Sequence, residues 1–569
     1  MTVPNRFTGR IAPRLRRLVA RIGEETWALA QVARSGALTP LPRGGLRAMS
    51  RAMRDYGPMA AAVSTAALRH GDRTALLDDR GPLSFADLEA RSNAVANALL
   101  RRGLRGGDTV AILARNHRGF VDALFAAAKC GARIVLLNTD FGAEQLRAVL
   151  AAEGAELLVH DDEYADAVAG IELRLGSVRA WAQTAAPDGL ESLIRYGDPA
   201  PPPGPGTRPQ LVILTSGTTG TPKGAPRAEP RTLVPAGGLL SAVPFRAREV
   251  TECCVPLFHA LGFGHLMLGL LLGSTLVIRR RFDPQQTLES LAAQRCSAMI
   301  AVPIMLRRLI DLDPQAWESK DLSALRIVFV AGSQLGTALC TEALSKLGPV
   351  IYNMYGSTEV AYATIANPDD LTVQPGCVGR VVPGTVVRLY DEMGRVVPAG
   401  SSGRIFVGNA IPFDGYTGGG TKDRIDGLLA SGDIGHFDSA GRLFIDGRDD
   451  DMIVSGGENV FPGEVEDALA AHPAVREAAV IGVPDEEYGQ RLRSFVAVYP
   501  GCQLTEQEVN VRERLARFKV PRDVMFVEAL PRNATGKVLK RLLDGDSAVD
   551  RPDPGLSGSG ADPFEVGNQ

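Results

Sequence analysis

The chain has 569 residues, of which 45% are hydrophobic and 22% are charged, and its formal net charge is −3 at pH 7. This length exceeds what one hydrophobic core supports, so the sequence predicts at least two domains. The nearly neutral charge gives no reason to expect nucleic acid as a partner. Seven scattered cysteines without a C-x-x-C pair argue against a disulfide framework and a zinc ribbon, and they favour a reducing compartment.

The first 60 residues are strongly basic, with eleven Arg against three acidic residues. Their net charge of +8 leaves −11 on the remaining 509 residues. From Ile11 to Leu29 apolar residues recur at helical spacing with arginines between them. A basic amphipathic helix of this kind suits an anionic membrane surface, which residues 1–55 would contact. The equal alternative is a helix that packs on the rest of its own chain and turns a solvated basic face outward.

We find no signal-peptide pattern, because the arginine-rich start has no apolar h-region. The longest apolar run is 13 residues from Leu266, which is too short to span a bilayer and predicts a buried helix or strand. We therefore expect a cytoplasmic protein, with peripheral contact at the inner face of the membrane left open.

Helical patterns alternate with short strand-like runs from about residue 62 to 200. A capped helix over 83–103 ends at Gly103, a strand follows over 109–113, and a second helix (120–132) and strand (133–138) come next. This alternation predicts mostly parallel sheets with helices on both faces. A Pro/Gly connector over 197–209 leads into a buried strand over 210–214. Further strand–helix alternation is expected to about Phe444.

After residue 447 the pattern changes to a compact set of a helix (463–473), two strands (477–484 and 493–499) and a second helix (506–518). The fold class expected is therefore α/β: a large N-terminal domain of mostly parallel sheets wrapped by helices, and a small, mobile α+β C-terminal domain. The expected divisions are a basic N-terminal extension (1–60), the large domain (61–447), the small domain (448–545) and a Gly-, Ser- and Pro-rich tail expected to be disordered (546–569).

The stretch "ILTSGTTGTPKG" (213–224) ends a buried strand in a loop rich in Gly and hydroxyls, with the single cation Lys223. Glycines let backbone N–H groups approach a ligand closely, hydroxyls donate further hydrogen bonds, and the Lys supplies charge. This chemistry suits a polyphosphate. The ordinary P-loop pattern of NTPases is not matched, because Lys223 stands between Pro222 and Gly224.

Five further blocks follow in order: "PLFHALGFG" (256–264), "YNMYGSTE" (352–359), "SGDIG" (431–435), "GRDDDMIVSGGENVFPGEVE" (447–466) and "PRNATGK" (531–537). Together with the phosphate loop they resemble the acyl-adenylate-forming enzymes, a superfamily that includes acyl-CoA synthetases, adenylation domains of peptide synthetases and luciferases. The resemblance extends over about residues 62–545. Two blocks depart from the family pattern: "GLLASGDIG" lacks a preceding aromatic residue, and "GYTGGGTK" is unusually rich in Gly.

The resemblance implies a nucleotide site. Its phosphate loop would be Thr215, Ser216, Gly217, Thr218, Thr219, Gly220 and Lys223. Two segments would flank the adenine and the α-phosphate, namely Gly332, Ser333 and Gln334, and Asn353, Met354, Tyr355, Gly356, Ser357 and Thr358. Asp433 would accept hydrogen bonds from both ribose hydroxyls, and Arg448 would be a second contact to the ribose. Glu359, with Thr215, would bind Mg²⁺, which prefers oxygen ligands. Taken alone, Glu359 also fits a helix-start carboxylate and Asp433 a turn residue.

The resemblance also implies how the reaction would proceed. Lys537 would bind the substrate carboxylate and the α-phosphate, because a cation is needed where two anions meet. Asp450 falls at the hinge of the small domain. Gly456, Gly457 and Glu458 match the segment that passes the pantetheine arm of the thiol acceptor. No carrier-protein motif follows in the chain, so CoA is the default acceptor.

The resemblance also implies an acyl pocket, which His259 and its neighbours would line. Amino-acid adenylation domains usually carry an Asp at this position, and His259 supplies no anion for an ammonium group; a core histidine is the alternative. At Gly356 acetate-specific relatives place a Trp, so the Gly would leave the pocket open. The other pocket residues implied are Gly262, Phe263, Gly264 and Ala331.

The function predicted is therefore ATP- and Mg²⁺-dependent activation of a medium- to long-chain fatty acid to acyl-AMP, followed by transfer to CoA. His259, Glu359 and Lys537 would be the catalytic residues. Two alternatives remain: a fatty acyl-AMP ligase that loads a separate carrier protein, and a catalytically silent, membrane-associated lipid binder.

Overall fold

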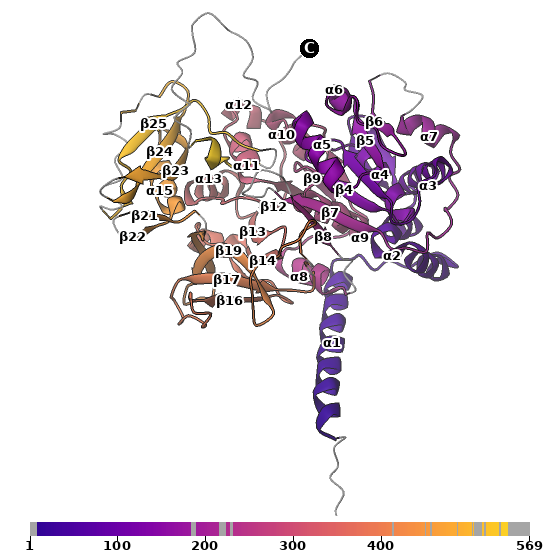
Figure 1. Ribbon diagram of the computed structural model, residues 1–569, viewed down its shortest axis with the longest axis horizontal. Helices are drawn as coiled ribbons and strands as arrows, with labels where there is room; N and C mark the ends of the chain where they lie inside the picture. Colours follow the sequence, from indigo (N-terminus) through magenta and orange to yellow (C-terminus); the bar gives the residue numbers. More distant parts are fainter. Residues whose placement is uncertain are drawn as a thin grey trace, which may run out of the picture.

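The strand–helix alternation of the sequence builds two mostly parallel sheets within the first 381 residues (Figure 1). The computed structural model describes residues 8–183, 189–215, 223–227, 232–411, 413, 415–449, 451–455, 458–485, 488–502, 504–505, 515–516, 519–533 and 536–543. For residues 8–19, 215, 454 and 458–459 the backbone alone is described.

The larger sheet has nine strands, and its centre is parallel. Its order is β15 (Arg380–Val381), β14 (Ala361–Ala366), β13 (Ile351–Ser357), β12 (Ile327–Val330), β11 (Ala298–Ala301), β9 (Val250–Cys253), β10 (Thr275–Ile278), β1 (Thr74–Asp78) and β2 (Gly81–Ser84). The second sheet has six strands: β6 (Ser177–Trp181), β5 (Leu157–Asp161), β3 (Thr109–Leu113), β4 (Arg133–Leu136), β7 (Gln210–Thr215) and β8 (Lys223–Arg227). Only β8 runs antiparallel to its neighbour in this sheet.

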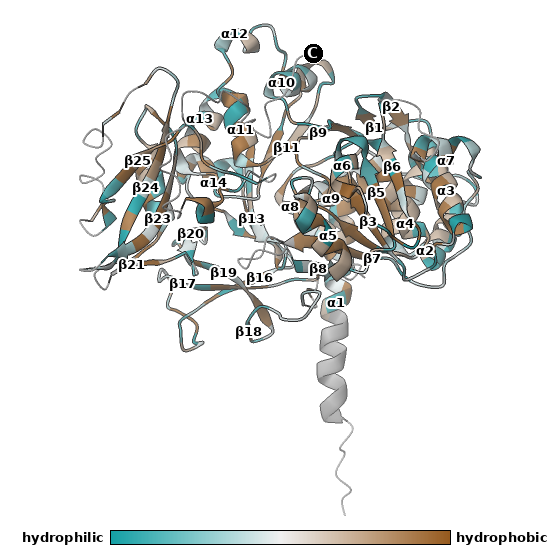
Figure 2. Ribbon diagram, turned by 45° about the horizontal axis from the view of Figure 1, so that its top comes forward, coloured by the Kyte–Doolittle hydropathy of each residue, from teal (hydrophilic) through white to brown (hydrophobic). Residues whose placement is uncertain are grey.

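Helices cover these sheets. They are α2 (Gly45–His70), α3 (Phe85–Arg102), α4 (Arg118–Lys129), α5 (Ala143–Ala152), α6 (Ala165–Val168), α7 (Leu190–Tyr196), α8 (Val234–Ala242), α9 (Ala260–Leu272), α10 (Pro284–Ala293), α11 (Pro303–Ile310), α12 (Pro314–Trp317), α13 (Thr337–Leu347) and α14 (Pro368–Val373). Strand β3, in the centre of the six-stranded sheet, is strongly apolar in Figure 2 and buried along its whole length, as expected of a strand covered on both faces. The apolar run from Leu266 forms the end of α9 and all of β10.

Local sequence signals explain several of these boundaries. The Ser84 side chain caps α3 by accepting a hydrogen bond from the Asp87 N–H at 3.0 Å. Gly103 ends the helix with a φ of +105°, a left-handed conformation that glycine adopts without strain. The predicted helix over 83–103 is therefore confirmed, and so is the strand over 109–113. All seven cysteines are free thiols, as the sequence predicted.

The region from Val386 to Arg448 differs from its prediction. We expected strand–helix alternation to about Phe444, but the described residues form an antiparallel sheet of β16 (Val386–Tyr390), β17 (Gly403–Gly408), β19 (Leu428–Phe437) and β18 (Arg424–Ile425), with β20 (Leu443–Arg448) on β19. Short turns join two of these pairs: residues 426–427 connect β18 to β19, and residues 438–442 connect β19 to β20. Asp438 stabilises the second turn by accepting hydrogen bonds from the backbone of Ala440 and Arg442. Turns this short favour antiparallel pairing, because a parallel pair requires a long crossover.

The C-terminal part is a small α+β domain, coloured orange to yellow in Figure 1. Helix α15 (Pro462–Ala470) packs on a sheet of β22 (Glu458–Val460), β21 (Ile453–Ser455), β24 (Gly489–Val498), β23 (Val475–Asp485) and β25 (Asp523–Phe526). The mixed α/β fold class with a smaller α+β domain is thus confirmed. Most of the helix expected over 506–518 and the whole tail over 546–569 lie outside the described residues.

The N-terminal extension divides into a projecting helix and a packed one. Helix α1 (Thr8–Arg34) extends away from the body of the molecule (Figure 1), and its inner end contacts α8. Helix α2 is kinked at Gly57, whose φ of +86° is not helical, and its second part continues through the expected boundary at residue 60. Tyr56 and Met59, on either side of the kink, belong to the main hydrophobic core. In the described part of the chain no helix combines the length and the apolarity needed to cross a bilayer.

Candidate active site

The phosphate loop is held at both ends by a pair of strands. β7 ends at Thr215 and β8 begins at Lys223, and these two residues are paired across the antiparallel ladder. Residues 216–222 between them, which include Ser216, Gly217, Thr218, Thr219 and Gly220, lie outside the described residues. The Lys223 side chain is exposed, and its Nζ lies 5.8 Å from the centre of the Tyr416 ring.

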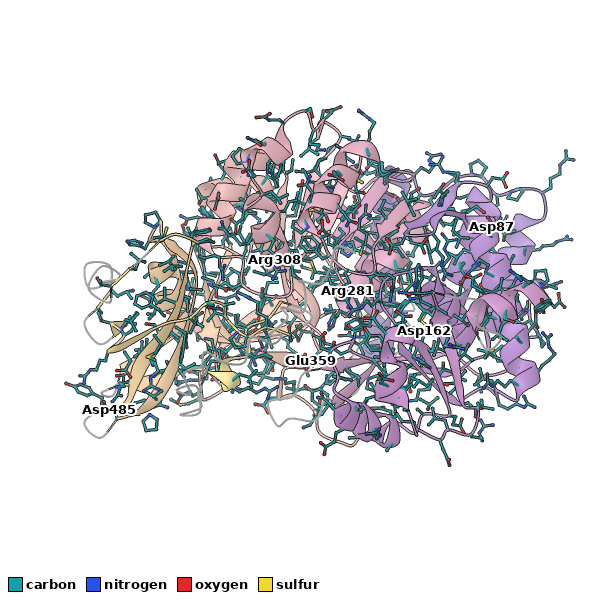
Figure 3. All side chains as sticks on the ribbon, turned by 90° about the horizontal axis from the view of Figure 1, so that it is seen from above. Asp87, Asp162, Arg281, Arg308, Glu359 and Asp485 are labelled. Carbon is teal, nitrogen blue, oxygen red and sulfur yellow. The ribbon has the colours of Figure 1, made fainter. Side chains whose placement is uncertain are left out.

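Glu359 follows β13 and lies near the middle of the molecule, between the small domain and the rest of the large domain in Figure 3. The Tyr416 hydroxyl donates to Glu359 Oε1 at 2.7 Å, and the Ser357 hydroxyl donates to Oε2 at 2.9 Å. The carboxylate is half-buried. Two hydroxyl donors therefore fix its orientation, and its remaining lone pairs are available to a ligand.

The residues around Glu359 fit a magnesium ion that brings phosphate oxygens with it. Mg²⁺ is usually held by one or two carboxylates together with substrate phosphates and water, rather than by a cage of protein side chains. Glu359 supplies one such carboxylate. In the described segments of the chain, no three His, Cys, Asp or Glu side chains converge as a separate metal cage.

The predicted ribose and adenine residues converge in the structure. Asp433 and Arg448 are paired across β19 and β20, with Arg448 Nη1 3.8 Å from Asp433 Oδ1. The Tyr355 hydroxyl donates to Asp433 Oδ2 at 2.5 Å. Burial and the neighbouring Asp433 raise the pKa of Tyr355 well above its usual value, so the phenol keeps its proton.

Four other predicted nucleotide residues have different surroundings. Asn353 is buried and donates to the Cys377 carbonyl at 3.4 Å, while Met354 packs against the main core. Both positions therefore support the fold around β13. Ser357 orients Glu359, as described above, and Thr358 completes the turn between them.

The segment after β12 faces the small domain. Gly332 has a φ of +98°, and a Cβ there would lie 3.1 Å from Val302 Cγ1. The Gln334 amide donates to Asp467 Oδ2 of α15 at 3.2 Å. Burial, with a smaller contribution from Glu466, raises the pKa of Asp467 to about 6. Gln334 thus contacts the small domain in this arrangement, and Ser333 between these residues is half-buried.

The loop that carries Lys537 rests on the large domain. Gly536 has a φ of +75°, and a Cβ there would lie 2.4 Å from Ile304 Cγ2 and 3.4 Å from Val302 Cγ2. The Lys537 N–H donates to Asn533 Oδ1 at 2.9 Å, which closes the turn. Lys537 itself is exposed. Val302 lies at the end of β11 and is close to both Gly332 and Gly536, so the small domain brings the Lys537 loop next to a predicted nucleotide segment.

His259 stands at the N-cap position of α9, where its half-buried side chain makes no capping hydrogen bond. Its ring lies 4.4 Å from the Phe258 ring, and its Nε2 is buried with no hydrogen-bond partner in the described part of the chain. Burial lowers the pKa of His259 to about 3, so the imidazole is neutral at physiological pH. A neutral ring can donate or accept a hydrogen bond, but it cannot form an ion pair with a carboxylate.

The glycines assigned to the acyl pocket are explained in different ways. A Cβ at Gly262 would lie 2.2 Å from the Pro256 carbonyl oxygen, and one at Gly356 would lie 1.9 Å from the Ala361 carbonyl oxygen. Close backbone approach therefore requires glycine at these two positions, whatever the size of the substrate. At Gly264 a Cβ would have no heavy atom within 4 Å, which leaves open space. Ala331 is buried, and Phe263 packs against the main core.

The predicted hinge and thiol segment are described only in part. Asp450, Gly456 and Gly457 lie outside the described residues. Glu458 begins β22, and its backbone pairs with Ser455 of β21. The roles assigned to these residues stay predictions.

Sequence reasoning missed two groups near Glu359. The first is the pair Tyr416 and Thr417, which contact Glu359 and β8. The second is Arg227, whose Nη1 is buried and unpartnered among the described residues. Burial lowers the pKa of Arg227 to about 10, and the nearby Glu359 opposes that shift. Arg227 lies four residues after Lys223 on β8. Because successive side chains of a strand point to opposite faces, this even spacing is the signal that places both cations on the same face.

Two family models and several known proteins match this chain. The model of the AMP-binding enzyme family matches residues 63–417, and that of the AMP-binding enzyme C-terminal domain matches residues 464–537. A feruloyl-CoA synthase from an Amycolatopsis species is 34% identical over 483 residues, which cover 83% of this chain and 94% of that protein. The fatty acid–[acyl-carrier-protein] ligase ScoC of Streptomyces coeruleorubidus is 31% identical over 499 residues, which cover 83% and 94%.

Solved structures show the same architecture. The crystal structure of the anthranilate CoA ligase AuaEII in complex with anthranoyl-AMP superimposes with a TM-score of 0.77 at 25% identity, covering 86% of this chain and 97% of that one. The ligand of that complex is an acyl adenylate, a mixed anhydride of a carboxylic acid and AMP.

Proposed function

Because the chain belongs to the AMP-binding enzyme family of acyl-adenylate-forming enzymes, we propose that it is an AMP-forming acid–thiol ligase that activates a carboxylate with ATP and transfers the acyl group to CoA. One observation carries the proposal: Tyr355, Asp433 and Arg448 contact one another, and the Lys537 loop lies on Val302, which also borders Gly332 of a predicted nucleotide segment. A ribose-binding carboxylate and a cation brought to the nucleotide by the small domain are the groups that adenylation requires.

In the first step a carboxylate oxygen of the acid attacks the α-phosphorus of ATP. The bond from that phosphorus to the bridging oxygen breaks, and pyrophosphate leaves with the electron pair. Asp433 holds the ribose, and Lys223 with the phosphate loop holds the outer phosphates. Lys537 neutralises the charge where the two anions meet. A magnesium ion, when bound beside Glu359, would neutralise further phosphate charge.

In the second step the CoA thiolate attacks the acyl carbonyl of the adenylate. The new carbon–sulfur bond replaces the carbon–oxygen bond, AMP leaves with the electron pair, and the thiol proton passes to solvent. For the thiol to enter, the Lys537 loop must withdraw from Val302 and Ile304, which it contacts here. We assign the pivot to Asp450 and the passage of the pantetheine arm to Gly456, Gly457 and Glu458.

The acid proposed is a medium- to long-chain fatty acid. Three features support an extended apolar substrate: the neutral His259, the open space beside Gly264 and the apolar side chain of Ala331. ScoC is named for a fatty acid, whereas the feruloyl-CoA synthase is named for an aromatic acid. An aromatic carboxylate is therefore the competing substrate class.

A carrier protein is the competing thiol acceptor, because ScoC is named as a ligase for an acyl-carrier protein. One experiment separates these possibilities. The purified chain is incubated with Mg-ATP and a panel of carboxylates from acetate to long-chain and aromatic acids, with and without CoA, and the products are followed by mass spectrometry. Acyl-CoA together with AMP is the expected result.

The other outcomes are equally informative. Acyl-AMP that accumulates and does not react with CoA would move the assignment to the carrier-protein ligase. A clear preference for aromatic acids would overturn the fatty acid. If no acid is turned over, the catalytically silent, membrane-associated lipid binder is the interpretation that remains.

We further assign the outer part of α1 to an anionic membrane surface. Its inner end packs on α8, where Ala28 is fully buried and Leu233 N–H donates to Glu25 Oε2 at 3.1 Å. Farther out, Ile22 is 56% exposed beside the exposed Arg21. An exposed apolar side chain among arginines suits an interface of acyl chains and anionic headgroups.

Deleting residues 1–19 tests this assignment, because it removes arginines and leaves the packed end of α1 intact. The full chain should float with vesicles that contain phosphatidylglycerol, and the truncated chain should remain at the bottom of the gradient. Equal flotation of both chains, or equal binding to purely zwitterionic vesicles, would contradict an electrostatic contact.

A further inference from the structure

A short glycine-rich turn, residues 415–420, lies between β17 and β18 and contacts two parts of the candidate site. Here it is called the 415–420 turn. It closes on itself: Tyr416 N–H donates to the Gly420 carbonyl at 3.0 Å, and Gly419 N–H donates to the Tyr416 carbonyl at 3.1 Å. Gly418, Gly419 and Gly420 all have positive φ, which other residues adopt only with strain. The turn therefore presents the two side chains at 416 and 417 in fixed positions.

Tyr416 is the contact with Glu359. Its hydroxyl donates to Glu359 Oε1 at 2.7 Å, and its ring packs edge-on against Phe413 at 5.0 Å between centroids. Burial, and then the hydrogen bond to Glu359, raise the pKa of the phenol, so it stays a donor at neutral pH. The ring also lies beside Lys223 Nζ, so one side chain contacts the carboxylate and adjoins the cation expected to hold phosphates.

Thr417 contacts β8 at Gly224, the residue that follows Lys223. Gly224 N–H donates to Thr417 Oγ1 at 3.0 Å, and Thr417 N–H donates to the Gly224 carbonyl at 2.8 Å. The Thr417 hydroxyl in turn donates to Glu153 Oε1 at 2.6 Å. A Cβ at Gly224 would lie 2.5 Å from Thr417 Oγ1 and 2.6 Å from Glu153 Oε1, so the packing at this point is tight.

Glu153 connects the turn to the rigid part of the six-stranded sheet. It is 8% exposed and pairs with Arg133 of β4 through its other oxygen, while Arg133 Nη1 also donates to the Glu153 carbonyl at 3.0 Å. β4 is paired with β7, the strand that enters the phosphate loop. The exit of the loop at Gly224 is therefore connected to its entry through Thr417, Glu153 and Arg133.

We propose that Tyr416 and Thr417 are positioning residues that fix the distance between Glu359 and the exit of the phosphate loop, so that the polyphosphate of ATP and its Mg²⁺ meet a prearranged carboxylate and Lys223. This inference rests on the proposed function in one respect, namely that ATP is the ligand. A carboxylate that holds a metal loses affinity when its own hydrogen-bond donor is removed, commonly by about 10–100-fold. Tyr416 has that relation to Glu359.

Two variants and two controls test the proposal. Tyr416→Phe and Thr417→Val each remove one hydroxyl and keep the side-chain volume. Tyr390→Phe is the matched control, since Tyr390 OH donates to a carboxylate, Asp426, at 2.9 Å in the same sheet as β17. Thr275→Val is the second control, since its hydroxyl donates to the Thr74 carbonyl at 2.7 Å on β10.

The first readout is nucleotide binding by calorimetry, with and without Mg²⁺. We expect Tyr416→Phe to weaken binding of ATP in the presence of Mg²⁺ by roughly tenfold and to leave Mg²⁺-free binding within twofold. The Thr417→Val variant should weaken ATP binding both with and without Mg²⁺. The second readout is hydrogen exchange without nucleotide, in which the peptide that contains Gly224 should exchange faster in Thr417→Val and recover in Thr417→Ser.

Each remaining outcome decides the question. If both variants bind Mg-ATP as tightly as the controls and Gly224 exchanges at the original rate, the proposal is wrong and the turn only supports the fold. If a variant has a melting temperature well below that of its control, the Thr417→Ser variant decides the question. Thr417→Ser keeps the hydroxyl, so stability that is restored without restored nucleotide binding would also refute the proposal. ATP binding without acyl transfer by the unaltered chain would refute the proposed function alone, and no ATP binding at all would refute both.

Discussion

The nucleotide side of the candidate site and its acyl side are stabilised in different ways. Around Asp433 and Glu359, hydroxyl groups from Tyr355, Ser357 and Tyr416 orient the carboxylates through hydrogen bonds. Around His259 and Gly264 a buried ring nitrogen has no hydrogen-bond partner among the described residues, and a Cβ at position 264 would meet open space. We therefore propose that the polar side binds one fixed ligand and that the acyl side selects its ligand by shape. This difference explains why the reaction is easier to assign than the acid.

The largest effect should come from the cation that joins the two sides. Lys537→Ala should slow adenylation by about 10²–10³-fold, because it removes the positive charge where carboxylate and phosphate meet. Thioester formation from supplied acyl-AMP should be nearly unchanged. Pyrophosphate release measures the first half-reaction and acyl-CoA formation the second, with Lys537→Arg as the control that keeps the charge. An equal loss of rate in both half-reactions would contradict the role assigned to Lys537.

The next effect concerns the polar side. Asp433→Ala should raise the KM for ATP by roughly 10–100-fold, because hydrogen bonds to a charged group contribute about 1.5–3 kcal/mol each. The KM for the acid should change little, since Asp433 contacts Tyr355 and Arg448 rather than the acyl side. Initial rates at varied ATP and varied acid give both constants. A larger change in the KM of the acid would show that the two sides are not separate.

The acyl side should respond to shape alone. Gly264→Leu places a side chain in open space, so it should fold normally and lower kcat/KM for the longest acids by about tenfold, with the shortest acids unaffected. Gly262→Leu is the matched comparison, because its Cβ would meet the Pro256 carbonyl and should destabilise the protein. Melting temperature and an acid panel measure both effects. Uniform loss for all acids in Gly264→Leu would place this residue outside the acyl path.

The smallest effect lies where the small domain contacts the large one. The pKa of Asp467, raised to about 6, exceeds that of an unfolded Asp, so its ionised form is disfavoured in the folded protein. Its contribution to stability is therefore fully present below the unfolded pKa and is lost as pH rises through about 6. Asp467→Asn should remove this loss and stabilise the protein at pH 8 by on the order of 1 kcal/mol, with a smaller gain at pH 5.

Chemical unfolding of the two proteins at both pH values checks this prediction. Glu466→Gln is a suitable control, because Glu466 makes only the smaller contribution to the shift. A stability difference that does not grow with pH would mean that Asp467 is not the titrating group.

Local signals in the sequence sufficed for much of the fold and part of the site. The N-cap at Ser84 and the glycine at 103 lie within one helix, and the register of Asp433 with Arg448 follows from one hairpin. The interactions of the 415–420 turn did not follow in this way. Tyr416 is 57 residues from Glu359, and Thr417 is 193 residues from Gly224. Spacing along the chain carries no information about contacts at such separations.

Glycines illustrate a second limit of sequence reasoning. Gly262, Gly264 and Gly356 all fitted the idea of an open pocket, yet only Gly264 borders open space. A glycine that lets two backbone segments touch and a glycine that leaves room for a ligand are the same letter in a sequence. Which of the two applies depends on the atoms that a Cβ would meet, and those atoms come from other elements of the fold.

Val302 gives the contact between the domains a further meaning. Its two methyl groups face the backbone of Gly332 on one side and of Gly536 on the other. In the proposed reaction the Lys537 loop withdraws before the thiol enters, so Val302 would lose its contact with Gly536 and keep the one with Gly332. We therefore expect withdrawal of the lysine to loosen the packing beside the predicted nucleotide segment, and this one aliphatic side chain would transmit the change.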